Sequence, residues 1–371
     1  MKEIEAFKRI AADPSAYAAE WKASSGGRII GFFCTYAIEE IIHAAGALPF
    51  RIFGTRDEIR LADSHLQAYC CSLVRGGLED ALAGRLSFLD GTVFPHTCDS
   101  IQRLSDIWRL NAGIPLHIDV VLPVKLDAPS SRDYFRGVVS RFRRTLAEAI
   151  GAPIDDDRLR RSIILYNEIR TYLEDIYRLR SEDPARIKGS DILSLLKASM
   201  AMDREACRDL LRILASNLAA SPSSGKAFKR IVLAGGICNQ PDIFEVLEAA
   251  GAAVVWDDLC TGSRYFEGLV RTDGDPAEAL ADRYAERIVC PAKHSGVDSR
   301  GKRLLDIVRR HRADGVIFII LKFCDPHSFD YPYLKECLDA AKVPSMLLEI
   351  EENYLPEGQV RTRLESFIEM I

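Results

Sequence analysis

Short apolar runs alternate with amphipathic stretches in two parts of the chain. The first part contains "RIIGFFC", "LPFRIFG", "DGTVFPHT" and "HIDVVLPV", and the second contains "RIVLAGGIC", "AAVVWDD", "DGVIFIILKFC" and "PSMLLEIEE". Helical spacing follows the first four runs, at about 37–45, 72–83, 99–110 and 132–150. This alternation predicts parallel strands whose faces are covered by helices.

The segment from about Ser131 to Ala220 has a different pattern. It is long, charged and helically periodic, and it contains no candidate strand. The stretches "KLDAPSS" and "ASPSSGK" bracket it and suit turns or linkers. We therefore predict an α/β protein with two parallel-sheet domains of Rossmann or flavodoxin-like type and a helical middle region. The expected divisions are an N-terminal helical arm (1–25), a first α/β domain (26–130), the helical region (131–226) and a second α/β domain (227–371).

Composition narrows the possible partners and compartment. The 371 residues are 48% hydrophobic, which is enough for a substantial core. The net charge of -5 and the lack of a long Lys or Arg block argue against nucleic acid. The N-terminal stretch mixes charges with its apolar residues, and no apolar run approaches the ~18 residues of a membrane span. We therefore expect no membrane association and a cytoplasmic location.

The ten cysteines are the main chemical signal. Without an export signal they do not read as a disulfide framework, which leaves buried apolar thiols, redox catalysis or metal binding. Cys34, Cys98, Cys238 and Cys324 lie at or just after the carboxyl end of a predicted strand, where open parallel sheets bind ligands. A single cysteine there is often only core, but four favour a ligand shared between the two domains.

Ligand type and spacing indicate which metal the thiols would hold. Soft thiolates select zinc or iron–sulfur clusters. The paired C-x-x-C elements usual for zinc are missing, so dispersed thiols favour iron–sulfur, and a zinc-stabilised scaffold remains an alternative. We expect backbone N–H groups at the helix starts after Cys34, Cys98 and Cys238 to donate to those sulfurs.

Several motifs occur in one order along nearly the whole chain: "FCTYAIEEIIHAAGALPFRIFG", "YCCSLVRGGLEDALAGRLSFLDGTVFPHTCDSIQRL", "GDPAEALADRYAERIVCPAKHS" and "GVIFIILKFCDPHSFDYPYLKECLDAAKVPSMLLEIEE". Together they resemble the superfamily of 2-hydroxyacyl-CoA dehydratases, benzoyl-CoA reductases and double-cubane cluster proteins. The resemblance implies an oxygen-sensitive iron–sulfur protein that receives electrons from a separate ATP-hydrolysing activator. It also implies a homodimer or a heterodimer with a homologous subunit. The chain itself lacks a P-loop, because "SPSSGK" has no leading Gly.

The resemblance also implies a set of ligands. Cys34, Cys71 and Cys324 look like the cluster ligands of the dehydratase subunits. Cys98, Cys238 and Cys290 also lie in motif-like surroundings, which makes six, the number expected for two cubanes bridged by a sulfide (8Fe-9S) rather than one 4Fe-4S cubane. The remaining thiols are assigned to the core: Cys70, Cys207, Cys260 and Cys337.

Three functions follow from the resemblance. The favoured one is reduction of a difficult substrate at a double-cubane cluster. The alternatives are a subunit of a 2-hydroxyacyl-CoA dehydratase or benzoyl-CoA reductase acting on acyl-CoA thioesters, and an electron-carrier partner without its own catalysis. His96 and His327 flank predicted ligands and are candidates for proton transfer. Asp99 and Asp325 share that position, but we expect them to be helix N-caps.

Overall fold

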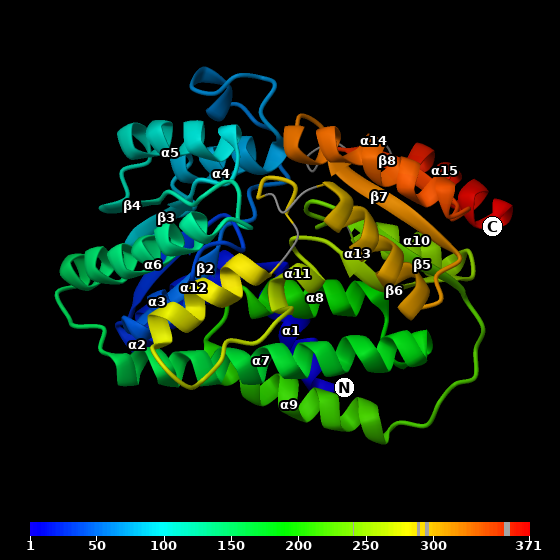
Figure 1. Cartoon of the computed structure of the whole chain (residues 1–371), viewed down its shortest axis with the longest axis horizontal. Helices are drawn as coiled ribbons and strands as arrows, with labels where there is room; N and C mark the ends of the chain where they lie inside the picture. Colours follow the sequence, from blue (N-terminus) through cyan, green and yellow to red (C-terminus); the bar gives the residue numbers. More distant parts are fainter. Residues whose placement is uncertain (240, 288–289, 294–296, 352–356) are drawn as a thin grey trace.

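Two four-stranded parallel sheets form the framework of the computed structural model, which describes residues 1–239, 241–287, 290–293, 297–351 and 357–371 (Figure 1). The first sheet has the order β2-β1-β3-β4 and the second the order β6-β5-β7-β8. The strands of the first are β1 (Arg28–Phe32), β2 (Ala47–Arg51), β3 (Gly91–Pro95) and β4 (Leu116–Val120). Those of the second are β5 (Lys229–Gly235), β6 (Ala252–Asp258), β7 (Gly315–Leu321) and β8 (Ser345–Ile350). The predicted α/β class with two parallel sheets is confirmed.

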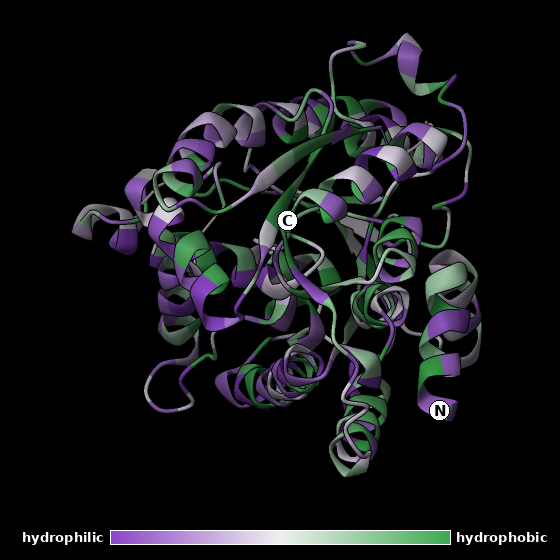
Figure 2. Ribbon diagram, turned by 90° about the vertical axis from the view of Figure 1, so that its right-hand side faces the viewer, coloured by the Kyte–Doolittle hydropathy of each residue, from purple (hydrophilic) through white to green (hydrophobic). Residues whose placement is uncertain are grey.

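Helices cover the sheets because the central strands are apolar on both faces. Every residue of the central strands β3 and β7 is buried, the pattern of parallel strands enclosed on two sides. Figure 2 shows hydrophobic strands inside and helices with hydrophilic outer faces. The helices beside the first sheet are α3 (Glu39–Ala44), α4 (Ser72–Leu82) and α5 (Asp99–Asn111). The second half contains α10 (Pro241–Ala249), α11 (Ser263–Phe266), α12 (Pro276–Glu286), α13 (Val297–Arg310), α14 (Asp325–Ala340) and α15 (Glu357–Met370).

Long helices connect the two sheets. They are α6 (Pro129–Ile150), α7 (Asp156–Glu182), α8 (Gly189–Ser199) and α9 (Arg204–Ala220), joined by the N-terminal α1 (Lys2–Ala12) and α2 (Pro14–Ser25). In Figure 1, α7 runs beneath both sheets and α9 lies below α7. Leu173 and Leu211 share one buried cluster with Val232 of β5 and Phe318 of β7, so these helices pack on the second sheet. Helix α12 packs on α6 and so returns to the first sheet, although it belongs to the second half of the sequence.

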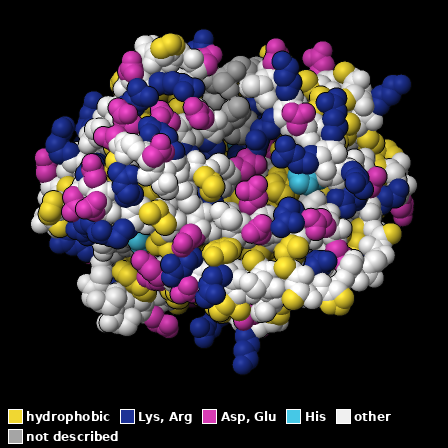
Figure 3. Space-filling model, turned by 60° about the horizontal axis from the view of Figure 1, so that its bottom comes forward, with side chains coloured by type: hydrophobic (Ala, Val, Ile, Leu, Met, Phe, Trp, Pro, Cys, Tyr) yellow, Lys and Arg dark blue, Asp and Glu magenta, His cyan; other side chains and the backbone are white. Residues whose placement is uncertain are grey.

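The outer surface carries both signs of charge. On the face in Figure 3, basic and acidic side chains are interspersed among hydrophobic ones. Within the described ranges, every helix is too short or too polar to cross a membrane.

The two sheets share one topology, which fixes where a ligand would sit. In each sheet, the strand that comes first in sequence lies between the second and the third. The second strand is therefore added on one side of it and the third on the other side. Ligands bind outside the carboxyl ends of strands at such a switch point. The switch points lie between β1 and β3 and between β5 and β7, and the residues after these strands line one cavity.

Candidate functional site

Six cysteines line a single cavity of about 90 Å³ between the two sheets. They are Cys34, Cys71, Cys98, Cys260, Cys290 and Cys324. All six are free thiols. Five belong to the predicted ligand set, and Cys260 is the sixth. Segments far apart in sequence therefore bring their sulfur atoms to one place.

The parallel strands explain why the thiols meet. Cys34 follows β1, Cys98 follows β3 and Cys324 follows β7, each at a carboxyl end. Cys260 follows β6 in the same way, so the strand-end rule that selected the other cysteines could have found it. Cys71 reaches the cavity from the start of α4.

Cys238 lies outside this cavity. Its side chain is fully buried, and its backbone N–H donates to Thr261 Oγ1 at 3.1 Å. Gly236 and Ile237 line the cavity instead. The chain turns at Gly235, whose φ of 141° suits only glycine and whose added Cβ would lie 1.9 Å from the carbonyl oxygen of Ile319. The residues directly after this turn, rather than the thiol of Cys238, line the cavity.

Three cavity cysteines begin helices. Cys71, Cys98 and Cys324 are the N-cap residues of α4, α5 and α14. The prediction that Asp99 and Asp325 are N-caps is wrong, because the cap position falls one residue earlier and both aspartates lie inside the first turn. The first-turn amides face the sulfurs, since an N-terminus leaves its N–H groups unpaired.

Burial and these amides act in opposite directions on the thiols. Burial raises the pKa of Cys71 to about 11 and the pKa of Cys98 to about 12. The amides of Val74 and Ile101, respectively, oppose that rise. Burial likewise raises the pKa of Cys290 to about 12. Without a metal these thiols stay protonated at neutral pH, so metal binding would release protons.

The arrangement suits a polynuclear cluster better than a single ion. Among the described residues, no three His, Cys, Asp or Glu side chains are arranged to hold one metal ion. Six cysteines from several elements line the cavity, and iron–sulfur clusters are held by several Cys thiolates. The donor set is soft sulfur, the ligand type that such clusters select. The guanidinium of Arg51 also lines the cavity, with its buried Nε and Nη1 atoms lacking any hydrogen-bond partner.

A buried ion pair lies next to the cavity, on the side formed by the second sheet. Arg264 is 3% exposed and donates through Nε and Nη2 to Asp258, both at 2.8 Å. Its Nη1 lies 3.5 Å from Cys260 Sγ and 3.4 Å from His327 Nε2. Arg264 thereby places a cation beside a cavity thiol, and nothing in the local sequence had singled it out as buried.

The two predicted histidines have different positions. His327 lines the cavity, and its Nδ1 lies 3.2 Å from Cys324 Sγ. Burial, reinforced by Arg264, lowers the pKa of His327 well below its usual value, so the ring is neutral. His96 lies outside the cavity lining, where its Nε2 lies 2.8 Å from Asp119 Oδ1.

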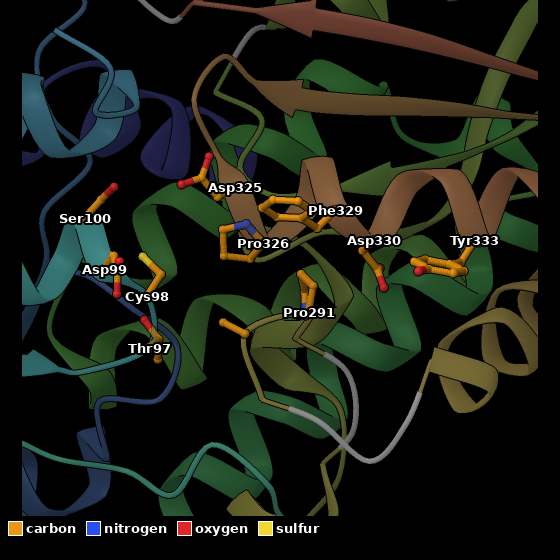
Figure 4. A pocket seen from close by; sticks show the side chains of 11 residues that line it. Thr97, Cys98, Asp99, Ser100, Pro291, Asp325, Pro326, Phe329, Asp330 and Tyr333 are labelled. Atoms are coloured by element: carbon orange, nitrogen blue, oxygen red, sulfur yellow. The ribbon is translucent and has the colours of Figure 1, made fainter.

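A wider cleft of about 420 Å³ adjoins the cavity. Both are lined by Thr97, Cys98, Ala292 and Pro326. Figure 4 shows Thr97 to Ser100 on one side of the cleft and Pro326, Phe329, Asp330 and Tyr333 along α14 on the other. Phe329 is 77% exposed there. The cleft gives a route from solvent to the thiols.

Comparison with known proteins gives matches over almost the full length. The family model described as 2-hydroxyglutaryl-CoA dehydratase, D-component, matches residues 34–371. The chain is 31% identical to a benzoyl-CoA reductase subunit of Thauera aromatica, over 95% of this chain and 94% of that protein. It is 27% identical to the (R)-phenyllactyl-CoA dehydratase beta subunit of Clostridium sporogenes, over 98% and 97% of the two chains. It is also 27% identical to the (R)-2-hydroxyglutaryl-CoA dehydratase beta subunit of Acidaminococcus fermentans, over 99% and 98%.

Proposed function

Because the chain belongs to the 2-hydroxyglutaryl-CoA dehydratase D-component family, we propose that it is the iron–sulfur subunit of an enzyme acting on acyl-CoA thioesters. One structural observation carries the proposal: six thiols from both sheets line one cavity. Each of these relatives is named as one subunit of an enzyme, which supports a partner subunit for this chain. We further propose that a separate ATP-hydrolysing activator supplies the electrons.

The cavity thiols would hold the cluster. Cys34, Cys71 and Cys324 are the first choice, and Cys98, Cys260 and Cys290 extend the set. When bound, the cluster would supply single low-potential electrons to the substrate. The first-turn amides of α4, α5 and α14 stabilise negative charge on their N-cap sulfurs.

His327 is the candidate for proton handling inside the cavity. Its neutral ring places Nδ1 within hydrogen-bond distance of Cys324 Sγ. Because Arg264 Nη1 can only donate to Nε2, the proton of the neutral ring lies on Nδ1, which would donate a hydrogen bond to Cys324 Sγ when this sulfur binds iron. His96 is held by Asp119 outside the cavity and would serve only the outer cleft.

The outer cleft would admit the thioester. It opens onto the thiols through Cys98 and Pro326, and Phe329 and Tyr333 offer apolar contacts to an acyl group. The acyl portion could then reach the cavity while the coenzyme A portion stays outside.

A double-cubane protein remains the second candidate. The named relatives favour the acyl-CoA subunit, whereas the count of six cavity thiols favours the larger cluster. Iron content separates them, since one cubane gives about four irons per chain and two give about eight.

The test is anaerobic purification followed by iron, sulfide and zinc determination. We expect iron and sulfide in the wild type and their loss in the triple variant Cys34→Ala, Cys71→Ala, Cys324→Ala. The matched control changes three thiols outside the cavity, Cys70→Ala, Cys207→Ala and Cys337→Ala, and should keep its iron. Stoichiometric zinc without iron in the wild type would contradict the proposal. Acyl-CoA turnover with activator, ATP, reductant and a candidate partner subunit then tests the substrate class.

A further inference from the structure

Arg51 occupies an unusual position at the cysteine cavity. It is the last residue of β2, where it pairs with Phe32 of β1, two residues before Cys34. Its side chain is 2% exposed and lines the cavity. The Nε and Nη1 atoms are buried without a hydrogen-bond partner. No carboxylate of the described residues lies within 4.0 Å of its guanidinium.

Most other buried arginines are paired with a carboxylate, whereas Arg283 donates to the carbonyl oxygens of Gly268 and Glu267. Arg170 pairs with Glu40, Arg204 with Glu39, Arg180 with Glu248 and Arg264 with Asp258. This fold therefore gives these other buried guanidiniums carboxylate or carbonyl acceptors, because leaving a buried charge without a partner has a high free-energy cost. Arg51 departs from that pattern at the place where the thiols gather. The compensating anion should therefore come from whatever the cavity holds.

We propose that Arg51 balances the negative charge of the cluster and donates N–H···S hydrogen bonds to it through Nε and Nη1. This inference rests on the proposed function. Guanidinium stays protonated in proteins and presents several donors in a rigid fork, so it suits a fixed anionic group. Reduction adds one negative charge, which a fixed cation stabilises. Arg51 thus raises the reduction potential of the cluster.

The decisive measurement is the midpoint potential of the cluster in protein that was loaded with iron and sulfide under anaerobic conditions. EPR follows the reduction during a redox titration. In Arg51→Gln we expect the equilibrium constant of one-electron reduction to fall about tenfold, a shift of about 59 mV to more negative potential. Arg60→Gln, at an exposed surface ion pair, is the control and should keep the wild-type potential. An unchanged potential in Arg51→Gln overturns the inference.

A second variant covers the case in which Arg51→Gln does not fold. Arg51→Lys keeps the charge but loses the fork, so we expect about a threefold fall in the same equilibrium constant, or about 28 mV. A wild-type potential in Arg51→Lys would then overturn the inference. A residue that only packs would reduce thermal stability and iron content without moving the potential of the loaded fraction.

The outcomes distinguish this inference from the function on which it rests. If the wild type binds no iron, the proposed function fails. If it binds iron and the Arg51 variants keep its potential, only the role of Arg51 fails. A higher KM for the acyl-CoA substrate with an unchanged potential would assign Arg51 to the substrate and also overturn the inference.

Discussion

The two halves of the molecule contain sheets of the same topology, and each half contributes three thiols to one cavity. The first half contributes Cys34, Cys71 and Cys98, and the second contributes Cys260, Cys290 and Cys324. They differ in how they treat charge. In the second half, Arg264 and Arg300 are held in ion pairs, and the buried Lys293 donates to two backbone carbonyl oxygens. In the first half, Nε and Nη1 of Arg51 have no hydrogen-bond partner.

This difference assigns separate tasks to the halves. Asp258 contacts Arg264, Arg300 and Arg303, and Arg300 also pairs with Asp330. Such a network holds the residues that the second half contributes to the cavity in place, whether or not the cavity contains a ligand. On the first side, the positive charge of Arg51 becomes compensated only when an anion is bound. The halves are thus alike in topology and unlike in their response to a ligand.

The largest expected effect comes from breaking the network of the second half. Asp258→Ala removes the carboxylate beside Arg264 and Arg300 and leaves both charges poorly compensated, so the free energy of unfolding should fall by about 4 kcal/mol. Denaturant unfolding measures the loss. Asp306→Ala, whose side chain is 71% exposed, is the control and should change little. If Asp258→Ala lost no more unfolding free energy than the control, the network would not be what stabilises the second half.

The neighbouring Asp257 should give a pH dependence of opposite sign to that of Asp258. Burial raises the pKa of Asp257 from 3.8 to about 6. Between these values the folded state binds more protons than the unfolded state, so stability falls as pH rises and the contribution is fully lost above pH 6. Over two pKa units this amounts to about 3 kcal/mol.

The measurement compares the wild type with Asp257→Asn, which cannot titrate. Between pH 3 and pH 7 the wild type should lose about 3 kcal/mol of unfolding free energy relative to the variant. Parallel pH profiles of the two proteins would show that Asp257 does not titrate as described. For Asp258 the arginines lower the pKa, so its contribution is lost instead as pH falls.

A smaller effect should follow from the turn after β5, which has no counterpart after β1. Gly235→Ala places a Cβ against the carbonyl oxygen of Ile319 and strains a positive φ. Gly251→Ala also has a positive φ, of 79°, but no atom lies within 4 Å of its added Cβ. We expect Gly235→Ala to lose about 2 kcal/mol more than Gly251→Ala in denaturant unfolding. Equal losses would mean that the close approach to β7 costs nothing.

The sequence predicted the sheets well because buried parallel strands are continuous apolar runs, and all eight occur where they were expected. It predicted Cys34, Cys98 and Cys324 at the cavity because the rule for strand ends depends only on topology. Cys260 obeys the same rule but was assigned to the core. The burial of Arg51 could not be predicted, since an arginine at a strand end normally reaches solvent and only tertiary packing encloses it.

Cys238 shows the limit of that rule. Its distance along the chain from β5 resembles that of other strand-end thiols, but the local turn decides which side chain enters the cavity. Backbone geometry at Gly235 is a tertiary property, because it depends on β7 lying close by. The helix caps were missed by one residue for a related reason: cysteine is an unusual N-cap, and its position reflects the cavity rather than capping preference.

The smallest expected effect, in free-energy terms, distinguishes Cys260 from Cys238. Cys260 lines the cavity beside Arg264, whereas Cys238 is fully buried and is not among the residues that line it. Cys260→Ser should therefore weaken iron retention at least about tenfold, or about 1.4 kcal/mol. Cys238→Ser is the matched control and should retain iron like the wild type. Retention is measured by iron loss to a chelator under anaerobic conditions. If Cys238→Ser lost iron and Cys260→Ser retained it, the third ligand of the second half would be Cys238 after β5 rather than Cys260 after β6.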